Sequence, residues 1–288
     1  MDDFMEKKKK TGWKIVKWIS ILGAVGCLGF AGWYRWSEVQ TQKEYEALQA
    51  QMAEQKEKEQ QYTLEEIQEA EFTGEIEVDV SAPEIPEGIL QEAEDNPVDF
   101  ARLKEINAEL YAWIRIPGTQ IDYPVAQHQG EDQSFYLHHD MYQNPRFSGC
   151  IYSENLNRQD FTDPVTVLYG HNMKNGSMFQ NLHQFRKQEF FDEHQYIYVY
   201  TSEKTYIYQI FAVYPYDDRH ILKSFDFSDE QVLADYLNEC QNPHSMEALV
   251  RSDVELTTDT PILTLSTCIG GRTEERLLVQ AVLLYEKE

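Results

Sequence analysis

The sequence predicts a mainly β domain with peripheral helices, preceded by an N-terminal transmembrane helix and a polar helical stalk. Three observations lead to this fold class. An uncharged run from Trp18 to Tyr34 follows a cluster of lysines, and residues 38–72 are rich in Glu, Gln, Lys and Ala without Gly or Pro. After residue 110, short segments rich in Val, Ile and Tyr alternate with turn residues, which is typical of strands. The first third of the 288 residues does not look globular, so we expect a single core.

The N-terminal part is predicted to comprise a cytoplasmic basic segment, residues 1–17, and a transmembrane signal-anchor, residues 18–36. In a helix, the seventeen uncharged residues from Trp18 to Tyr34 span about 26 Å, close to the thickness of the hydrocarbon core. Lysines precede this run and acidic residues follow it. The positive-inside rule therefore predicts a single-pass protein of the cell membrane, with its N-terminus in the cytoplasm and its main domain extracellular.

Two other processing routes compete with a retained anchor. Small residues between Gly23 and Gly26 suit a cleaved signal peptide, and Ala24 to Cys27 form a partial lipobox. The apolar sequence continues to Trp33, beyond either cleavage site, which favours a helix that stays in the membrane.

After the anchor we expect a helical stalk over residues 37–72, an acidic linker over 73–96 and the main domain over 97–288. Residues 1–36 carry a net charge of +4, which leaves −29 for the remainder of the chain. A domain this negative will not bind nucleic acid through its phosphates, so that class of function is excluded. We interpret the acidic surface as an ordinary solvated one.

Within the main domain, apolar residues at helical spacing from Phe100 onward predict an amphipathic helix over residues 98–112. Further helices are expected at 178–190 and at 227–239, the latter with Ser228 as its N-cap. The predicted strands are Ile121–Ala126, Gly149–Ser153, Val165–Tyr169, Tyr196–Thr201, Thr205–Tyr214, Ile262–Cys268 and Arg276–Tyr285. Their number suits a closed barrel.

The chain has four cysteines, too few for a disulfide scaffold. Cys27 lies in the predicted span, which leaves Cys150, Cys240 and Cys268 outside. An odd number of external cysteines leaves at least one thiol free. Whether Cys150 pairs with Cys240 stays open, with buried free thiols as the default.

Three residues with complementary chemistry stand at strand ends. Cys268 ends the apolar run that begins at Ile262, Arg276 opens the next apolar run, and His171 follows the strand predicted to end at Tyr169. A thiol with a pKa of about 8.5 is mostly protonated at neutral pH, so a nucleophilic cysteine needs a histidine or a cation beside it. Taken singly, the three would be a packed cysteine, a turn histidine and a surface arginine. Together they predict a cysteine nucleophile with an acid–base partner and a fixed cation.

Three ordered motifs resemble those of the sortase family, and of its class B in particular. Residues 264–268 read TLSTC, and Arg276 follows before LLVQAVL. Residues 169–179 read YGHNMKNGSMF, and residues 113–119 and 121–125 read WIRIPGT and IDYPV. The resemblance covers roughly residues 97–288. It implies the family's eight-stranded β-barrel, with a helix before the seventh strand.

The resemblance also implies a reaction. A sortase cysteine attacks the carbonyl at a Thr-Gly or Thr-Asn bond of a C-terminal sorting signal, and an amine resolves the thioester. Carried over by motif, Cys268 is the nucleophile, His171 the acid and then the base, and Arg276 the cation that orients or stabilises the carbonyl oxygen. Arg272 is a rival to Arg276, but it follows two glycines and is expected to lie on a mobile loop.

Five neighbouring residues are predicted to bind substrate. Ser266 lies one side-chain alternation from Cys268 and should face the same way, with Thr267 between them. The other three, Asn172, Met173 and Ser177, follow His171, the predicted acid and base. Ordinary strand and loop packing explains these residues equally well.

No metal or other cofactor is expected. His138, His139 and Asp140 are the most ligand-like group, but neighbours on an extended chain point in opposite directions and cannot easily share one ion. No compact acidic loop has the spacing of calcium ligands.

The leading hypothesis is a membrane-anchored cysteine transpeptidase of a Gram-positive bacterium. Its expected partners are secreted proteins with a C-terminal sorting signal and, as acceptor, an amine of a peptidoglycan precursor in the cell wall. One alternative is a class B enzyme that assembles pili with a pilin lysine as the amine. A second is a non-catalytic surface binding module, and a third is a plain thiol protease, since hydrolysis shares the acyl-enzyme intermediate.

Overall fold

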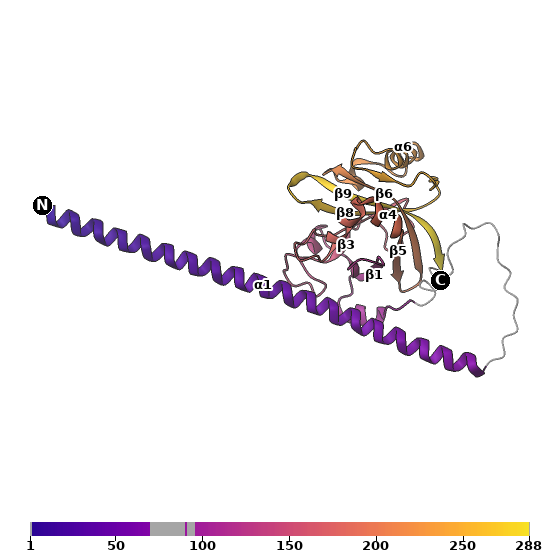
Figure 1. The fold of residues 1–288 in the computed structure, drawn as a ribbon, viewed down its shortest axis with the longest axis horizontal. Coiled ribbons are helices and arrows are strands. Elements are labelled where there is room, and N and C mark those ends of the chain that lie inside the picture. Colours follow the sequence, from indigo (N-terminus) through magenta and orange to yellow (C-terminus); the bar gives the residue numbers. More distant parts are fainter. Residues whose placement is uncertain (1, 70–89, 91–95, 288) are drawn as a thin grey trace. The chain divides into compact units, whose positions relative to one another are not determined.

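A computed structural model describes residues 2–69, 90 and 96–287 (Figure 1). The chain divides into two compact units, one up to Glu44 and one from Tyr45 onward. Helix α1 (Asp2–Glu69) runs through the boundary between them. The acidic linker predicted at 73–96 lies outside the described residues, apart from its residues 90 and 96.

The first unit is the N-terminal part of α1. Several large apolar side chains on it are exposed, among them Trp18, Val25, Leu28, Phe30 and Trp33. Over the part of the chain that the structure describes, no helix combines the length and the hydropathy of a membrane span.

The second unit is built on one nine-stranded sheet in the order β5-β1-β2-β3-β4-β8-β9-β6-β7. Its strands are β1 (Leu110–Arg115), β2 (Asp122–Gln127), β3 (Ile151–Ser153), β4 (Val165–Tyr169), β5 (Tyr196–Thr201), β6 (Thr205–Asp217), β7 (Leu249–Val250), β8 (Ile262–Ile269) and β9 (Arg272–Lys287). A further pairing between β5 and β6 closes eight of the strands into a barrel, and the two-residue β7 lies beside β6. The predicted eight-stranded barrel is therefore confirmed.

Short helices cover this barrel. They are α3 (Phe100–Ile106), η1 (Phe135–Leu137), η2 (Phe179–Arg186), α4 (Gln188–Glu193), α5 (Ile221–Ser224) and α6 (Glu230–Gln241). Helix α6 precedes β8, the seventh barrel strand, as the family resemblance implied. It packs through Leu233, Tyr236 and Leu237 on residues of β6 and β9 such as Phe211 and Leu278. A second and larger apolar cluster includes residues of β1, β2 and β5 together with other residues of β6, β8 and β9, such as Ile207, Leu265 and Val279.

Two tight turns fix the register of the hairpins. In the β5–β6 turn, the Thr201 hydroxyl accepts a hydrogen bond from the Lys204 N–H (2.9 Å). The β8–β9 turn passes through Gly271 with φ of +80°, a conformation that glycine adopts without strain. The second turn keeps the end of β8 directly beside the start of β9.

The helix predicted over 98–112 is wrong in its second half. Helix α3 ends at Ile106, and its C-cap Asn107 has an extended backbone. The side-chain amide of Asn107 donates to the Tyr136 hydroxyl (2.6 Å). Leu110 and Trp113, which fit a helical period, instead lie on β1 between β2 and β5. Strand pairing on both sides outweighs the local apolar spacing.

Two other helix predictions need correction. The N-cap of α6 is Asp229, whose carboxylate accepts from the backbone N–H groups of Gln231 and Val232, and Ser228 instead donates to Asp226. The single helix predicted over 178–190 is divided into η2 and α4.

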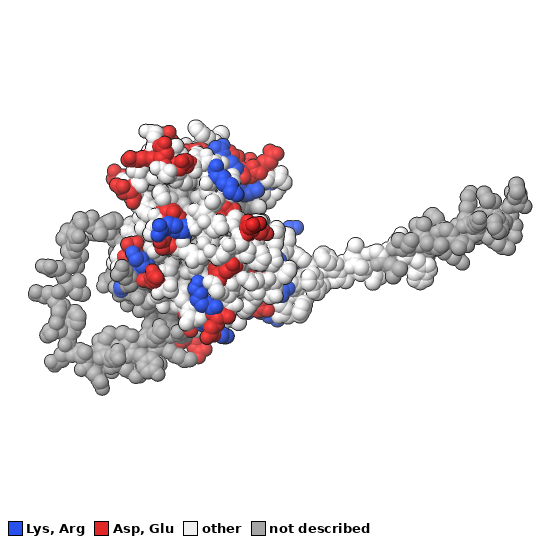
Figure 2. Space-filling model, turned by 180° about the vertical axis from the view of Figure 1, so that it is seen from behind, with Lys and Arg blue, Asp and Glu red and all other residues white. Residues whose placement is uncertain are grey.

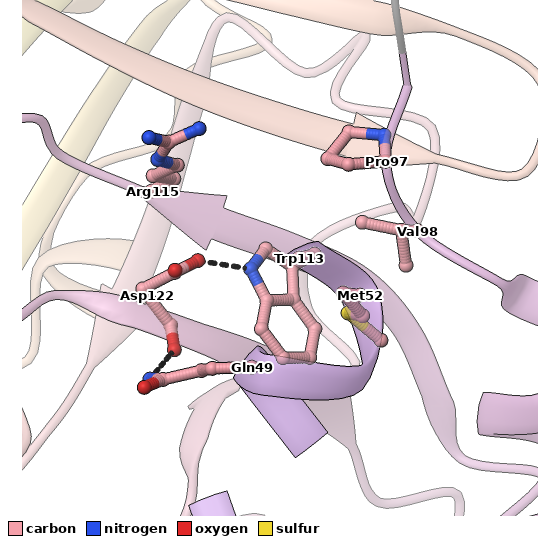
Figure 3. Close-up of a pocket in the computed structure, with 7 residues that line it drawn as sticks. All are labelled: Gln49, Met52, Pro97, Val98, Trp113, Arg115 and Asp122. Atoms are coloured by element: carbon pink, nitrogen blue, oxygen red, sulfur yellow. Dashed lines mark hydrogen bonds between the residues drawn. The ribbon is translucent and has the colours of Figure 1, made fainter. Parts of the chain in front are cut away.

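The part of α1 that follows Tyr45 packs on the barrel. Tyr45, Leu48 and Met52 are buried, and the Tyr45 hydroxyl donates to the backbone carbonyl of Gly149 (3.4 Å). Figure 3 shows Met52 and Gln49 of this helix beside Trp113 and Asp122 of the barrel. Gln49 donates to the backbone carbonyl of Asp122. The Trp113 indole N–H donates to the Asp122 carboxylate (2.6 Å). The start of the predicted stalk thus contributes to the core of the domain.

Candidate active site

Cys268 and Arg276 are direct cross-strand neighbours. Strands β8 and β9 are antiparallel, and Cys268 pairs in register with Arg276. Cys268 is exposed, whereas the residues on either side of it in β8, Thr267 and Ile269, are buried. Residues opposite each other on antiparallel strands have Cβ atoms about 5 Å apart. The fold therefore brings a thiol and a guanidinium group to the same end of the barrel.

The segment that carries His171 is tied to the same end of β8. Strand β4 is parallel to β8, and Tyr169 pairs with Ser266. Beyond β4, the Gly170 carbonyl accepts from the Thr267 hydroxyl (2.7 Å), and the Asn172 amide donates to the Cys268 carbonyl (3.0 Å). The two chain neighbours of His171 are thus both bound to the cysteine segment. The structure therefore places the backbone of His171 beside the segment that carries Cys268, and the joint action of the three residues stays a prediction.

The His171 ring is held on two sides. Its Nε2 donates to the Leu137 carbonyl (2.8 Å), and the Phe147 ring stacks on it with centroids 5.3 Å apart. Burial lowers the pKa of His171; the Leu137 carbonyl opposes this shift and the neighbouring His138 adds to it. A lowered pKa makes the imidazolium form a stronger acid, which suits a group that must give a proton to a departing amine.

The two candidate arginines differ in their partners. The Arg276 guanidinium donates to the backbone carbonyls of Thr273 (3.1 Å) and Glu275 (3.0 Å), and no carboxylate in the described residues forms an ion pair with it. Arg272 instead binds the carboxylates of Glu275 (2.9 Å) and Glu247 (2.8 Å), which raise its pKa. The prediction that Arg272 lies on a mobile loop is wrong, because it opens β9.

A pocket opens beside this end of the barrel. Its lining includes Ser266 and Arg276 from the predicted site, together with Tyr169, Tyr216 and His220. Ser266 therefore lines a pocket at this end of the barrel, and its predicted contact with substrate stays a prediction.

The other four predicted substrate residues have internal roles in this structure. Thr267 and Asn172 each donate one of the hydrogen bonds that join the histidine and cysteine segments. Met173 and Ser177 are buried, and the Ser177 hydroxyl donates to the Asn175 side chain (2.7 Å). Their predicted contact with substrate stays a prediction.

Sequence reasoning missed two histidines near the site. The Nε2 of His183 donates to the Cys268 carbonyl (3.1 Å), and burial lowers the pKa of His183. The Nε2 of His220, which lines the pocket, lies 2.6 Å from a carboxylate oxygen of Glu154. Both contacts join residues far apart in the chain, and no local motif marks them.

The cysteines divide by exposure. Cys150 and Cys240 are free and buried, and burial raises the pKa of each thiol to about 12. Both are therefore poor nucleophiles at neutral pH. Cys268 is the exposed thiol of the barrel unit.

Two of the three ligand-like residues His138, His139 and Asp140 contact backbone groups of their own segment. The Asp140 carboxylate, 1% exposed, accepts from the backbone N–H groups of Tyr142 (3.0 Å) and Asn144 (2.9 Å). The Nδ1 of His139 lies 2.8 Å from the Phe135 carbonyl. Among the residues that the structure describes, no three His, Cys, Asp or Glu side chains are grouped to hold a metal ion.

Comparison with known proteins gives a consistent result. The sortase domain model matches residues 114–284. Sortase B of Listeria monocytogenes is 30% identical over 184 residues, which cover 63% of this chain and 72% of the relative. Sortase B of Staphylococcus aureus is 30% identical over 187 residues, covering 64% and 74% respectively.

Solved structures agree with these sequence matches. The crystal structure of Clostridium perfringens sortase B has a TM-score of 0.59 and 32% identity, and the match covers 65% of this chain and all of that one. A Staphylococcus aureus sortase B–substrate complex has a TM-score of 0.57 and 30% identity, with 64% and 83% covered. The chain therefore belongs to class B of the sortase family and is a sortase-type cysteine transpeptidase.

Proposed function

We propose that Cys268 is the nucleophile of this transpeptidase and that it acts on a C-terminal sorting signal. Its Sγ attacks the carbonyl carbon of a threonine, the C–N bond to the next residue breaks, and a thioester links the threonine to the enzyme. The observation that carries the proposal is the exposed Cys268, in register with Arg276 and tied through Asn172 to the histidine segment.

His171 and Arg276 take the two supporting roles. The His171 imidazolium gives its proton to the leaving amine; when a new amine attacks the thioester, the neutral ring removes the proton from it. Arg276 carries a permanent charge that its carbonyl partners do not neutralise. It therefore stabilises the negative oxygen of the tetrahedral intermediate.

The enzyme works at the outer face of a cell membrane in this proposal. A lysine-rich start followed by exposed apolar side chains on α1 supports an N-terminal anchor with its N-terminus in the cytoplasm. The substrates are then secreted proteins, and the acceptor is an amine of a peptidoglycan precursor in a Gram-positive cell wall.

Mass spectrometry of reaction products tests this proposal. The full-length chain in detergent is incubated with a library of sorting-signal peptides and with candidate amines. We expect peptides cleaved after threonine and joined to one class of amine, with no product from Cys268→Ala or His171→Ala. Product formed by the Cys268→Ala variant would refute the assigned nucleophile.

A further inference from the structure

Two contacts on the His171 ring come from one distant segment. Leu137, the last residue of η1, provides the carbonyl that accepts from Nε2 at 2.8 Å. Phe147, on the loop that follows, stacks its ring on the imidazole with the two planes 13° apart. The first contact fixes which nitrogen carries the hydrogen, and the second restricts rotation of the ring.

The segment from Leu137 to Phe147 is itself fixed. Asp140 accepts from two backbone N–H groups inside it and from the Arg146 Nε (3.2 Å). The Arg146 N–H donates to the His138 carbonyl (2.8 Å), which joins the two ends of the segment. A buried carboxylate with several donors holds a loop in one conformation. Several hydrogen bonds therefore support the segment that places Leu137 and Phe147 beside His171.

The phenyl ring is not explained by core packing. Phe147 is 55% exposed, and an aromatic side chain that stabilises a fold is usually buried. Its stacked partner is the one imidazole that the proposed reaction uses. An exposed aromatic ring in this position is better explained by the geometry of that imidazole than by the stability of the barrel.

We propose that Leu137 and Phe147 are positioning residues that make Nδ1 the atom of His171 that exchanges protons. With Nε2–H bound to the Leu137 carbonyl, the neutral ring has its lone pair on Nδ1. In the imidazolium form, the proton on Nδ1 is the one given to the leaving amine, because the Nε2 proton stays in its hydrogen bond. The inference rests on the proposed role of His171 and adds the residues that orient it.

The tautomer and the stacking are measurable without catalysis. We would record long-range ¹H–¹⁵N correlations on the full-length chain labelled at histidine, with His171→Gln to assign the signals. The expected result is a neutral ring protonated at Nε2. The signals of its ring protons should be shifted upfield by Phe147, and this upfield shift should be lost in Phe147→Ala. A ring protonated at Nδ1, or ring shifts unchanged in Phe147→Ala, would overturn the proposal.

Kinetics then separate positioning from a structural role. Because stacking contributes about 0.5–1.5 kcal/mol, Phe147→Ala should lower kcat about 2- to 12-fold and leave KM unchanged. Phe147→Tyr and Phe147→Trp should keep kcat, and Phe147→Leu should not. The matched control is Leu156→Ala, which removes another exposed apolar side chain and should behave as wild type.

Each kinetic outcome has one meaning. Wild-type kcat in Phe147→Ala, or full rescue by Phe147→Leu, contradicts positioning by the aromatic ring. If His171→Gln retains activity, the proposed function of His171 fails instead, so the two failures are distinguishable. Circular dichroism of each variant confirms that losses do not come from unfolding.

Discussion

At the scale of single residues, Arg276 and Arg272 differ in the groups that surround their charges. Two carboxylates bind Arg272, and Arg272 joins Glu247 and Arg186 in a chain of ion pairs at the protein surface. Exposed pairs of this kind contribute little to stability, because solvent screens the two charges. Arg276 has only carbonyl partners among the described residues and stands opposite Cys268. Arg276 is therefore the better candidate for a cation that responds to charge on a substrate.

This difference predicts opposite results for two matched substitutions. Arg276→Lys keeps a charge but loses the fork of donors, so we expect kcat/KM to fall about 10²- to 10³-fold. Arg272→Lys should stay within about 3-fold of wild type, because it changes only exposed ion pairs. Steady-state kinetics with one sorting-signal peptide measures both. A large loss in Arg272→Lys beside a small one in Arg276→Lys would reverse the assignment.

Sequence reasoning could propose the chemical residues but not the residues that support them. The motif TLSTC and the Gly-His-Asn turn identify Cys268 and His171 because their residue types carry the chemistry. Phe147, His183 and the Glu154–His220 pair act through contacts that arise only when distant segments meet. No local pattern encodes such contacts, so they were not predicted.

At the scale of elements, the strands were more predictable than the helices. Strands β4 and β5 match their predicted bounds, and β8 matches its own within one residue, because runs of Val, Ile and Tyr pack well in a sheet. Strand β1 was missed because its apolar residues also fit a helical period. Its identity depends on pairing with β5, which lies far along the chain. Long-range pairing is the information that the local pattern lacks.

One glycine links the fold to the site. Gly149 has φ of +62°, and a Cβ there would lie 2.5 Å from the Tyr136 carbonyl oxygen and 2.7 Å from that of Leu137. The Leu137 oxygen is the one that binds His171. A side chain at Gly149 would therefore strain the backbone and displace the carbonyl that orients the imidazole.

We expect Gly149→Ala to lower the free energy of unfolding by more than about 2 kcal/mol and to reduce kcat. Gly176→Ala is the matched control for stability, because its φ of +90° is also positive but its nearest neighbour lies 3.4 Å away. Its cost should be about 1–2 kcal/mol. Urea denaturation compares the two variants. Equal stability of Gly149→Ala and wild type would show that the clash is absent.

The helix segment that packs on the barrel makes a separate prediction. Tyr45 is 1% exposed and stacks edge-on against Tyr123, with ring centroids 5.3 Å apart. Tyr45→Ala should lower the free energy of unfolding by about 3–5 kcal/mol. A domain that begins after residue 72 should lose a similar free energy of unfolding. A domain that begins before Tyr45 should keep the full stability. Equal melting temperatures for the two domains would show that the segment does not stabilise the barrel.

At the scale of the whole molecule, charge and apolar surface are unevenly distributed along the chain. Acidic and basic side chains are interspersed over the face of the barrel unit in Figure 2, although the net charge of the chain is −25. Exposed apolar side chains such as Trp18 and Leu28 are found instead on the N-terminal part of α1. A charged, mixed surface keeps a domain in water, and an apolar helix surface favours a lipid environment.

Flotation with liposomes tests the proposed anchor. The full-length chain should rise with the vesicles through a density gradient at both low and high salt, because burial of apolar side chains does not depend on ionic strength. A variant that lacks residues 2–36 should stay at the bottom. Full-length chain that remains with the soluble fraction would contradict the anchor.

The central claim, that Cys268, His171 and Arg276 act as one site, is tested most directly by intact-mass spectrometry of the full-length chain mixed with a sorting-signal peptide and no amine. We predict a thioester adduct on Cys268 that disappears on addition of the acceptor amine. Cys268→Ala should show no adduct, and His171→Ala and Arg276→Lys should form it at least about 10²-fold more slowly. An adduct on another residue, or one formed at the wild-type rate in His171→Ala, would contradict the account.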